Sequence, residues 1–236
     1  MFFDPLYLLV IGVGMALSLY ASSITKGRFR KYSQYTTRSR MTGAQVAQGI
    51  LDDNNIRDVR IEPVGGELTD HYDPRTKTLR LSQPVYDSNS MAAFGVAAHE
   101  VGHAIQHAKS YTLLSFRSAW VPVANLGGGL SMFVIILAVF LGGANSATGA
   151  SLSWLGVLLF GCTTVFTLVT LPVEFDASSR ALKALQKGNY VTEKELDGAR
   201  KVLNAAAMTY VAAFVTSLLT LLYWMFRLGL LGGRRD

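Results

Sequence analysis

The stretch that organises this chain reads MAAFGVAAHEVGHAI and occupies residues 91–105. It places His99 and His103 four positions apart, with Glu100 between them. Positions i and i+4 of a helix share one face and lie about 6 Å apart along the axis, so both imidazoles can reach one ion. The apolar flanks predict a buried helix, in which two imidazoles and a carboxylate need a partner. The pattern therefore predicts a zinc hydrolase site with Glu100 as the general base.

A catalytic zinc usually has three protein ligands and a water, so the two histidines need a third residue. His107 lies one turn further along, but an unbroken helix places it about 12 Å from His99. Glu174 follows Pro172 at the end of an apolar stretch and opens a predicted helix. We therefore predict that His99, His103 and Glu174 bind one zinc ion per chain, with His107 as the competing candidate.

Charged residues are unevenly spaced along the 236 residues, of which 50% are hydrophobic and 16% charged. Uncharged runs of 21, 56 and 25 residues follow Asp4, Arg117 and Lys201. A membrane-spanning helix needs about 20 apolar residues, and the longest run has a glycine-rich turn near its middle, so it holds two spans. The sequence thus predicts four transmembrane helices near residues 5–23, 120–142, 151–172 and 205–227.

Basic residues predict how these spans are oriented. Of 22 Lys and Arg residues, 13 lie in 26–117, 6 in 180–201 and 3 in 227–235. Cytoplasmic loops carry the excess of positive charge, so the first two segments are expected to face the cytoplasm. Topology and the lipid bilayer then account for the sequence pI of about 9.5, and no nucleic acid partner is expected.

The long loop 24–119 resembles a compact α+β domain. Residues 42–51 have a threonine N-cap candidate and an amphipathic pattern, and 59–63 and 78–82 have the composition of short strands. The strand at 78–82 is a candidate rail for an extended substrate, although it can equally be plain scaffold. Ser88-Asn-Ser90 is expected to cap the helix that carries the two histidines.

His71 and Tyr72 belong to segment 70–75, which the sequence predicts to be a turn. Either side chain could donate a hydrogen bond to the oxyanion of a tetrahedral intermediate, and we therefore name both as candidate catalytic residues. The structural alternative is a turn histidine and a packed tyrosine. Asp176 and Arg180, four positions apart, are expected to form an ion pair within their helix, on the side away from Glu174.

Three segments together resemble the bacterial YugP-like neutral zinc metallopeptidases over nearly the whole chain. They are Leu68-Thr-Asp-His-Tyr-Asp-Pro-Arg75, His99-Glu-Val-Gly-His-Ala-Ile-Gln-His107 and Leu171-Pro-Val-Glu-Phe-Asp-Ala-Ser178. That family is similar in layout to the larger membrane proteases of the HtpX and CAAX-prenyl protease type. The resemblance implies a multi-pass membrane endopeptidase with His99, His103 and Glu174 on zinc and Glu100 as base.

One position departs from the larger relatives, which usually carry an aspartate four residues after the glutamate ligand to orient a zinc histidine. This chain has Ser178 there. Asp176, Asp70 and Asp73 are the candidates for the orienting carboxylate.

The predicted fold is a mainly α membrane protein with four transmembrane helices and a cytoplasmic α+β zincin-like catalytic domain built on the HExxH helix. The predicted function is that of a gluzincin-like zinc endopeptidase in a bacterial cell membrane, with its active site toward the cytoplasm and polypeptides, including membrane-associated ones, as substrates. The alternative is a non-catalytic membrane scaffold that keeps a structural zinc site. The expected segments are a first transmembrane helix (1–23), the catalytic domain (24–119), two transmembrane helices (120–172), a helical segment with the third ligand (173–204), and a fourth transmembrane helix with a short tail (205–236).

Overall fold

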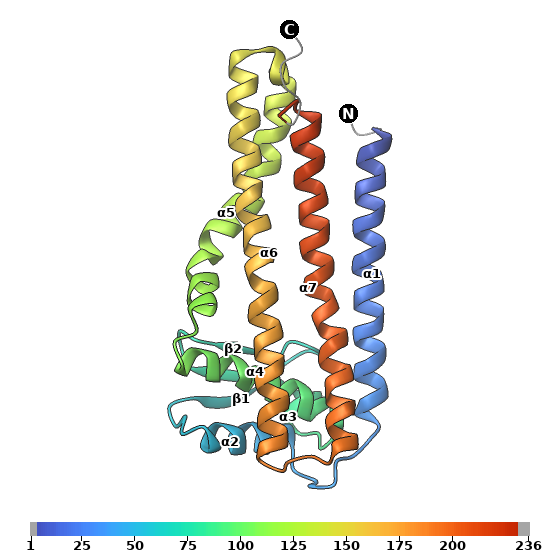
Figure 1. The fold of residues 1–236 in the computed structure, drawn as a ribbon, viewed down its shortest axis with the longest axis vertical. Coiled ribbons are helices and arrows are strands. Elements are labelled where there is room, and N and C mark those ends of the chain that lie inside the picture. The colour runs from blue at the N-terminus through green and yellow to red at the C-terminus, as the bar shows by residue number, and fades with distance from the viewer. Residues whose placement is uncertain (1–3, 231–236) are drawn as a thin grey trace. The chain divides into compact units, whose positions relative to one another are not determined.

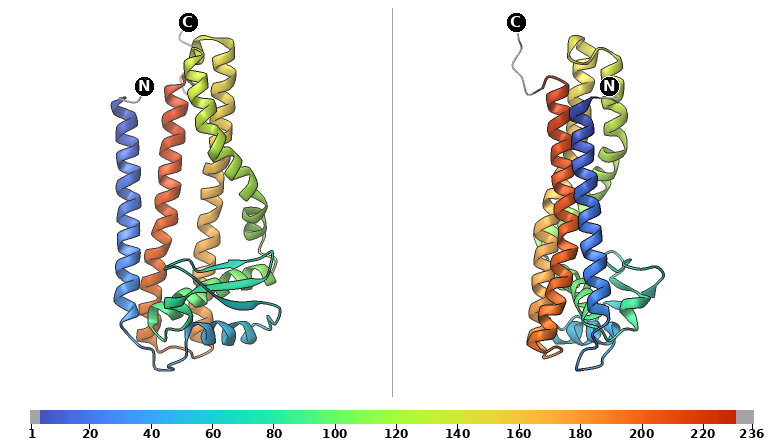
Figure 2. Two further views of the ribbon diagram at one scale, coloured as in Figure 1. Left: turned by 180° about the vertical axis from the view of Figure 1, so that it is seen from behind. Right: turned by 90° about the vertical axis from the view of Figure 1, so that its right-hand side faces the viewer.

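The computed structural model describes residues 4–230, and most of them are helical (Figures 1 and 2). Four helices are long and apolar enough to cross a membrane: α1 Pro5–Ser33, α5 Thr112–Phe140, α6 Ala147–Lys187 and α7 Glu193–Arg227. A short 3-10 helix, Gly143–Asn145, lies between α5 and α6. The prediction of four long apolar helices is confirmed, although α5 ends two residues before the predicted boundary at 142. Residues 1–3 of the first predicted segment and 231–236 of the predicted tail lie outside the described residues.

The long helices extend beyond the predicted spans into charged sequence. α1 continues to Ser33, and α6 runs without a break through Pro172 to Lys187. The predicted helix start at Glu174 is therefore wrong. A proline fixes φ near the helical value and removes one backbone donor, and apolar helices with packed neighbours tolerate this loss.

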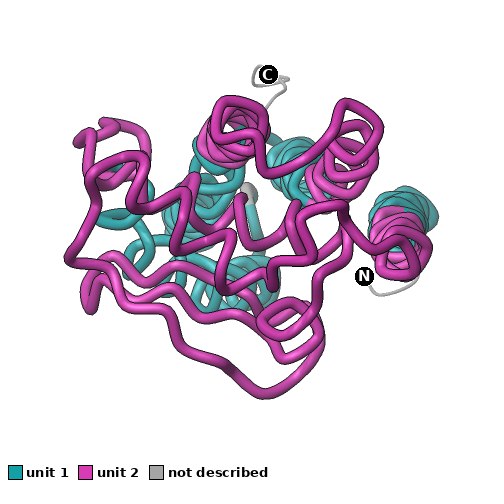
Figure 3. Tube along the Cα trace, turned by 90° about the horizontal axis from the view of Figure 1, so that it is seen from below, with its two compact units in different colours: residues 1–20, 116–171, 210–236 teal, residues 21–115, 172–209 magenta. Residues whose placement is uncertain are grey.

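The chain forms two compact units, which Figure 3 colours separately. The first unit comprises residues 1–20, 116–171 and 210–236, and the second comprises 21–115 and 172–209. In the first unit, side chains of α5, α6, α7 and the residue directly after α7 form a buried apolar cluster of Ile135, Val157, Tyr223, Trp224 and Leu228. The second unit contains the sheet, the short helices and the charged ends of the long helices.

A small sheet in the second unit consists of β1 Arg60–Val64, β2 His71–Asp73 and β3 Thr78–Ser82. β3 is the central strand, parallel to β1 and antiparallel to β2. The strands predicted at 59–63 and 78–82 are confirmed to within one residue, but the predicted turn at 70–75 contains β2, and the turn follows it. Because β3 has a partner on each side, it has no free edge, and its prediction as a substrate rail is wrong.

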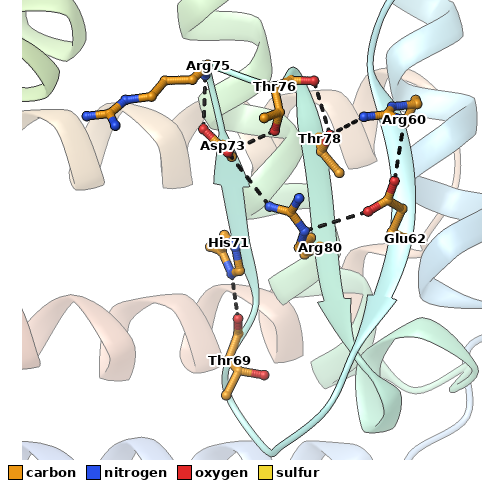
Figure 4. Close-up of polar contacts among 9 residues, drawn as sticks. All are labelled: Arg60, Glu62, Thr69, His71, Asp73, Arg75, Thr76, Thr78 and Arg80. Carbon is orange, nitrogen blue, oxygen red and sulfur yellow. Dashed lines mark hydrogen bonds and ion pairs between the residues drawn. The ribbon is translucent and has the colours of Figure 1, made fainter.

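The two faces of the sheet differ. Leu79 and Leu81 of β3 are fully buried. On the other face Arg80 lies between two carboxylates, 3.6 Å from Glu62 and 3.8 Å from Asp73 (Figure 4). Such partly exposed ion pairs contribute little stability, so the buried face is what fixes the sheet onto the core.

The core of the second unit is built around α4 Met91–Ala108, with α2 Gly43–Asp53 and α3 Gln83–Tyr86 beside it. Both predicted caps are confirmed: Thr42 forms a capping box at α2, and Ser90 accepts a hydrogen bond from a backbone N–H of α4. Nearly every side chain of α4 from Met91 to Gln106 is buried. The helix that carries the motif is therefore an interior element. The core side chains that surround it include Val46, Ile50, Leu79, Leu81, Val202 and Leu203.

α4 approaches α6 very closely at Gly102. A Cβ atom at this position would lie 2.4 Å from the backbone oxygen of Ala177, which is inside any normal contact distance. Only a glycine permits this approach without a shift of one backbone. The contact brings the first charged turns of α6 beside the motif.

Candidate metal centre

Two consecutive turns of α4 present the imidazoles of the motif. The His99 and His103 ring centroids are 4.9 Å apart and the rings are nearly perpendicular. Both side chains are largely shielded from solvent, with exposed fractions of 13% and 11%. The spacing expected for positions i and i+4 is thus realised on a buried helix face.

Glu174 reaches the same point from α6. Its Oε2 atom lies 3.2 Å from Nε2 of His99 and 3.5 Å from Nε2 of His103. Glu174 is buried, and burial acts to raise its pKa. Hydrogen bonds and positive charge from the two histidines outweigh that effect and hold the pKa well below the usual range, so the carboxylate is ionised at neutral pH.

These three residues fit the geometry of a zinc site. Their ligand atoms all lie within 4.8 Å of one another, and no other such group of three occurs in residues 4–230. Two atoms bound tetrahedrally to zinc at about 2.0–2.1 Å are about 3.3 Å apart, close to the two distances at Glu174. Two imidazole nitrogens and a carboxylate oxygen are also a common donor set for catalytic zinc.

The second nitrogen of each imidazole has its own hydrogen-bond partner. Nδ1 of His99 lies 3.0 Å from Oγ of Ser178, a hydroxyl that can donate or accept, and Nδ1 of His103 lies 3.0 Å from Oε1 of Gln106, an oxygen that only accepts. Nδ1 of His103 therefore carries a proton. In a neutral His103 ring the Nε2 atom is then the one available to a metal ion beside Glu174.

Glu100 lies beside this group on α4 and is buried, with 8% of its surface exposed. Burial raises the pKa of Glu100, while the neighbouring charges of His99 and His103 oppose the rise. A carboxylate whose pKa is moved toward neutrality suits proton transfer. The position of Glu100 beside the two histidines and its burial are what the predicted role of a base requires.

The structure separates His107 from the three clustered residues. Its Nδ1 atom is hydrogen-bonded to the hydroxyl of Tyr72 at 2.8 Å, and both side chains line a cavity of about 310 Å³. Burial, followed by the charges of Asp58 and Asp73, raises the pKa of Tyr72 to about 12. The Tyr72 hydroxyl is therefore protonated at neutral pH and can donate a hydrogen bond.

His71, the other candidate donor, is exposed on β2, and its Nδ1 donates to the backbone oxygen of Thr69 at 2.8 Å (Figure 4). Of the candidate orienting carboxylates, Asp70 accepts hydrogen bonds from the backbone and hydroxyl of Ser82. Asp73 accepts hydrogen bonds from the backbone N–H of Arg75 and the hydroxyl of Thr76 in the turn after β2. Only Asp176 connects to the imidazoles, through an intervening side chain.

That intervening residue is Gln106, for which the sequence alone predicted no role. Its Nε2 donates to Asp176 and to the backbone oxygen of Val173, both at 2.8 Å. The predicted ion pair between Asp176 and Arg180 is confirmed. The sequence does show a glutamine three positions after His103, one turn along the same helix face. Its partners lie about 70 residues away in the sequence, so its role could not be predicted from the local pattern.

Comparison with known proteins agrees with this geometry. A family model described as "putative neutral zinc metallopeptidase" matches residues 7–229. The chain is also 44% identical over 217 residues to a protein of Bacillus subtilis (strain 168) named "putative membrane protease YugP", covering 92% of this chain and 94% of that protein. No solved structure matches. Because the family model and the relative both extend over nearly the whole length, the chain belongs to the neutral zinc metallopeptidase family of that description.

Proposed function

We propose that this protein is a membrane-embedded, zinc-dependent endopeptidase. The observation that carries the proposal is the convergence of His99, His103 and Glu174, with a buried Glu100 on the next position of the same helix. Family membership supports peptide hydrolysis over other hydrolytic chemistry, since the donor set alone would serve any amide. One zinc ion per chain is expected.

Zinc at this site would polarise the scissile carbonyl and acidify the attacking water. Glu100 then accepts the proton of that water and delivers it to the leaving amine. The neutral hydroxyl of Tyr72 and the ring of His71 are the candidate donors to the oxyanion. The hydrogen bonds to Ser178 and Gln106 would hold the rings of His99 and His103 in place.

An extended polypeptide is the substrate class that the sheet favours. β2 has one partner, β3, so its other edge is available for main-chain hydrogen bonds. β2 also packs against α4, the helix that carries the histidines. A substrate strand added to β2 would therefore run beside the motif helix, with His71 and Tyr72 on the strand that receives it.

The proposed membrane arrangement rests on the four apolar helices and on the distribution of basic residues. Segments 1–23, 120–172 and 205–236 would contain the spans, and segments 24–119 and 173–204 would together form a cytoplasmic catalytic domain. The Bacillus subtilis relative carries the words "membrane protease" in its name, which supports a location in the bacterial cell membrane.

The topology is tested by single cysteines at Ser110, Lys187 and Thr148 in a Cys162→Ser background. A reagent that does not cross the membrane should label Thr148→Cys in intact cells, and should label the other two only after the cells are opened. Labelling of Ser110→Cys and Lys187→Cys from opposite faces would contradict a shared zinc site.

The activity is tested on the purified full chain in detergent with casein and unfolded peptides as substrates. Cleavage should stop when zinc is removed by a chelator and return when zinc is added. A chain that binds one zinc ion tightly but cleaves no polypeptide, at any zinc level, would favour the structural-zinc scaffold instead.

A further inference from the structure

The hydrogen-bond partners of the two imidazoles differ in their chemical groups. The His99 ring faces a hydroxyl, and the His103 ring faces an amide. Gln106 is fully buried, so its amide has no water to satisfy it and depends on protein partners alone. Its orientation is therefore decided by the groups around it.

Those groups allow only one orientation of the Gln106 amide. Asp176 Oδ2 and the Val173 backbone oxygen both lie 2.8 Å from its Nε2 atom, and both can only accept hydrogen bonds. A flipped amide would place its oxygen against these two oxygens and its NH2 group against His103. Oε1 must consequently face Nδ1 of His103, and that nitrogen must carry the proton.

Asp176 is in turn fixed by Arg180, whose Nε donates to the same Oδ2 atom. The guanidinium of Arg180 lies over the ring of Tyr111, 5.5 Å from its centre. The backbone N–H of Tyr111 donates to the backbone oxygen of Gln106. These contacts thus form a closed loop from Gln106 through Asp176, Arg180 and Tyr111 back to Gln106.

We infer that Gln106, oriented by Asp176, is a positioning residue that fixes the tautomer and direction of His103 for metal binding, and that the hydroxyl of Ser178 holds the direction of the His99 ring. This inference rests on the proposed zinc site. Asp176 acts indirectly. Its negative charge orients the amide of Gln106, and the amide oxygen accepts a hydrogen bond from the imidazole N–H of His103. Loss of such a partner typically weakens metal affinity about 10–100-fold.

The experiment measures the zinc dissociation constant of the full chain in detergent by competition with a chelator. Gln106→Met should weaken zinc binding by about 10–100-fold, and Asp176→Ala and Ser178→Ala by about 3–10-fold. The double variant Gln106→Met with Asp176→Ala should bind zinc as weakly as Gln106→Met alone, because Asp176 acts through Gln106.

The matched control is Ile105→Val, which removes one buried methyl group from the adjacent position of α4. It should lower the melting temperature without changing zinc affinity. With cobalt in place of zinc, the visible absorption spectrum should change in Gln106→Met and stay as in the unmodified chain in Ile105→Val. A purely structural role for Gln106 would leave the spectrum unchanged.

Unaltered zinc affinity in Gln106→Met would overturn the inference, and additive effects in the double variant would remove Asp176 from it. Should Gln106→Met fail to fold, Asp176→Ala decides: weakened zinc binding supports the inference and unchanged binding refutes it. Failure of the unmodified chain to bind zinc would instead refute the proposed function, so the two failures are distinguishable.

Discussion

The two units use polar side chains in opposite ways. In the first unit, hydroxyls mostly bond to a carbonyl of their own helix, as Ser153 does to Gly149 and Thr170 to Phe166. In the second unit, polar side chains connect different elements, as Asp70 does with Ser82 and Gln106 with Asp176. Polar groups satisfied locally suit a hydrocarbon environment, whereas bonds between elements can specify a site.

The two units also differ in which side chains they expose. Phe133, Phe140 and Leu158 of the first unit are more than half exposed, with exposed fractions of 66%, 79% and 63%. The second unit buries most of its large apolar side chains in one core, although Phe175 is half exposed, and it exposes ion pairs such as Lys77 with Asp58. This difference supports the proposal that the first unit lies in lipid and the second in water.

The largest effect is expected where a bond between elements builds the metal site. Glu174→Ala should weaken zinc binding by more than about 100-fold, above the usual cost of losing an outer partner, because only two imidazoles remain. His107→Ala should keep one zinc ion per chain. Zinc per chain in the two purified variants measures this, and a loaded Glu174→Ala beside an empty His107→Ala would reverse the assignment.

The next largest effect is expected when Glu100, the proposed base, is replaced. Glu100→Gln should keep zinc near one equivalent and lower cleavage by about 10²–10⁴-fold, because the amide has the same shape but cannot accept the proton. Turnover of a fluorogenic peptide, measured with metal content on the same samples, checks this. Normal turnover with full metal would exclude Glu100 from the mechanism.

The next prediction compares an added charge on the exposed surface of each unit. Phe133→Lys, near the middle of the predicted span 120–142, should cost about 3 kcal/mol in membrane insertion. The same charge added in the second unit, as Gln48→Lys on the exposed face of α2, should change little. The membrane-inserted fraction of each variant is the measurement. Equal insertion of both would remove the distinction between the two surfaces.

The sequence predicted best what depends on local pattern. The spacing of His99 and His103, the caps at Thr42 and Ser90, and the apolar helices all follow from residues close together in the chain. Helix ends were predicted less well, because α6 continues through Pro172, where a local rule predicts a boundary.

Properties that depend on packing between distant segments were missed. That β3 is the central strand, with no free edge, follows from a pairing order that the strands themselves do not encode. The role of Gln106 depends on which side of α6 faces α4.

The smallest expected effect concerns how closely the elements of the second unit must pack for such bonds to form. Gly102→Ala would place a methyl group against the Ala177 backbone, so either α4 or α6 must shift, at a cost of about 1–3 kcal/mol in the free energy of unfolding. The control is Gly27→Ala on α1, also in the second unit, where no atom lies within 4 Å of the added Cβ. There the substitution should stabilise the helix by about 0.5–1 kcal/mol, since alanine loses less conformational entropy than glycine. Thermal unfolding of both variants without metal separates packing from zinc binding. If both variants melt at the temperature of the unmodified chain, the close approach of α4 and α6 is not required, and the bonds between elements alone must hold the site together.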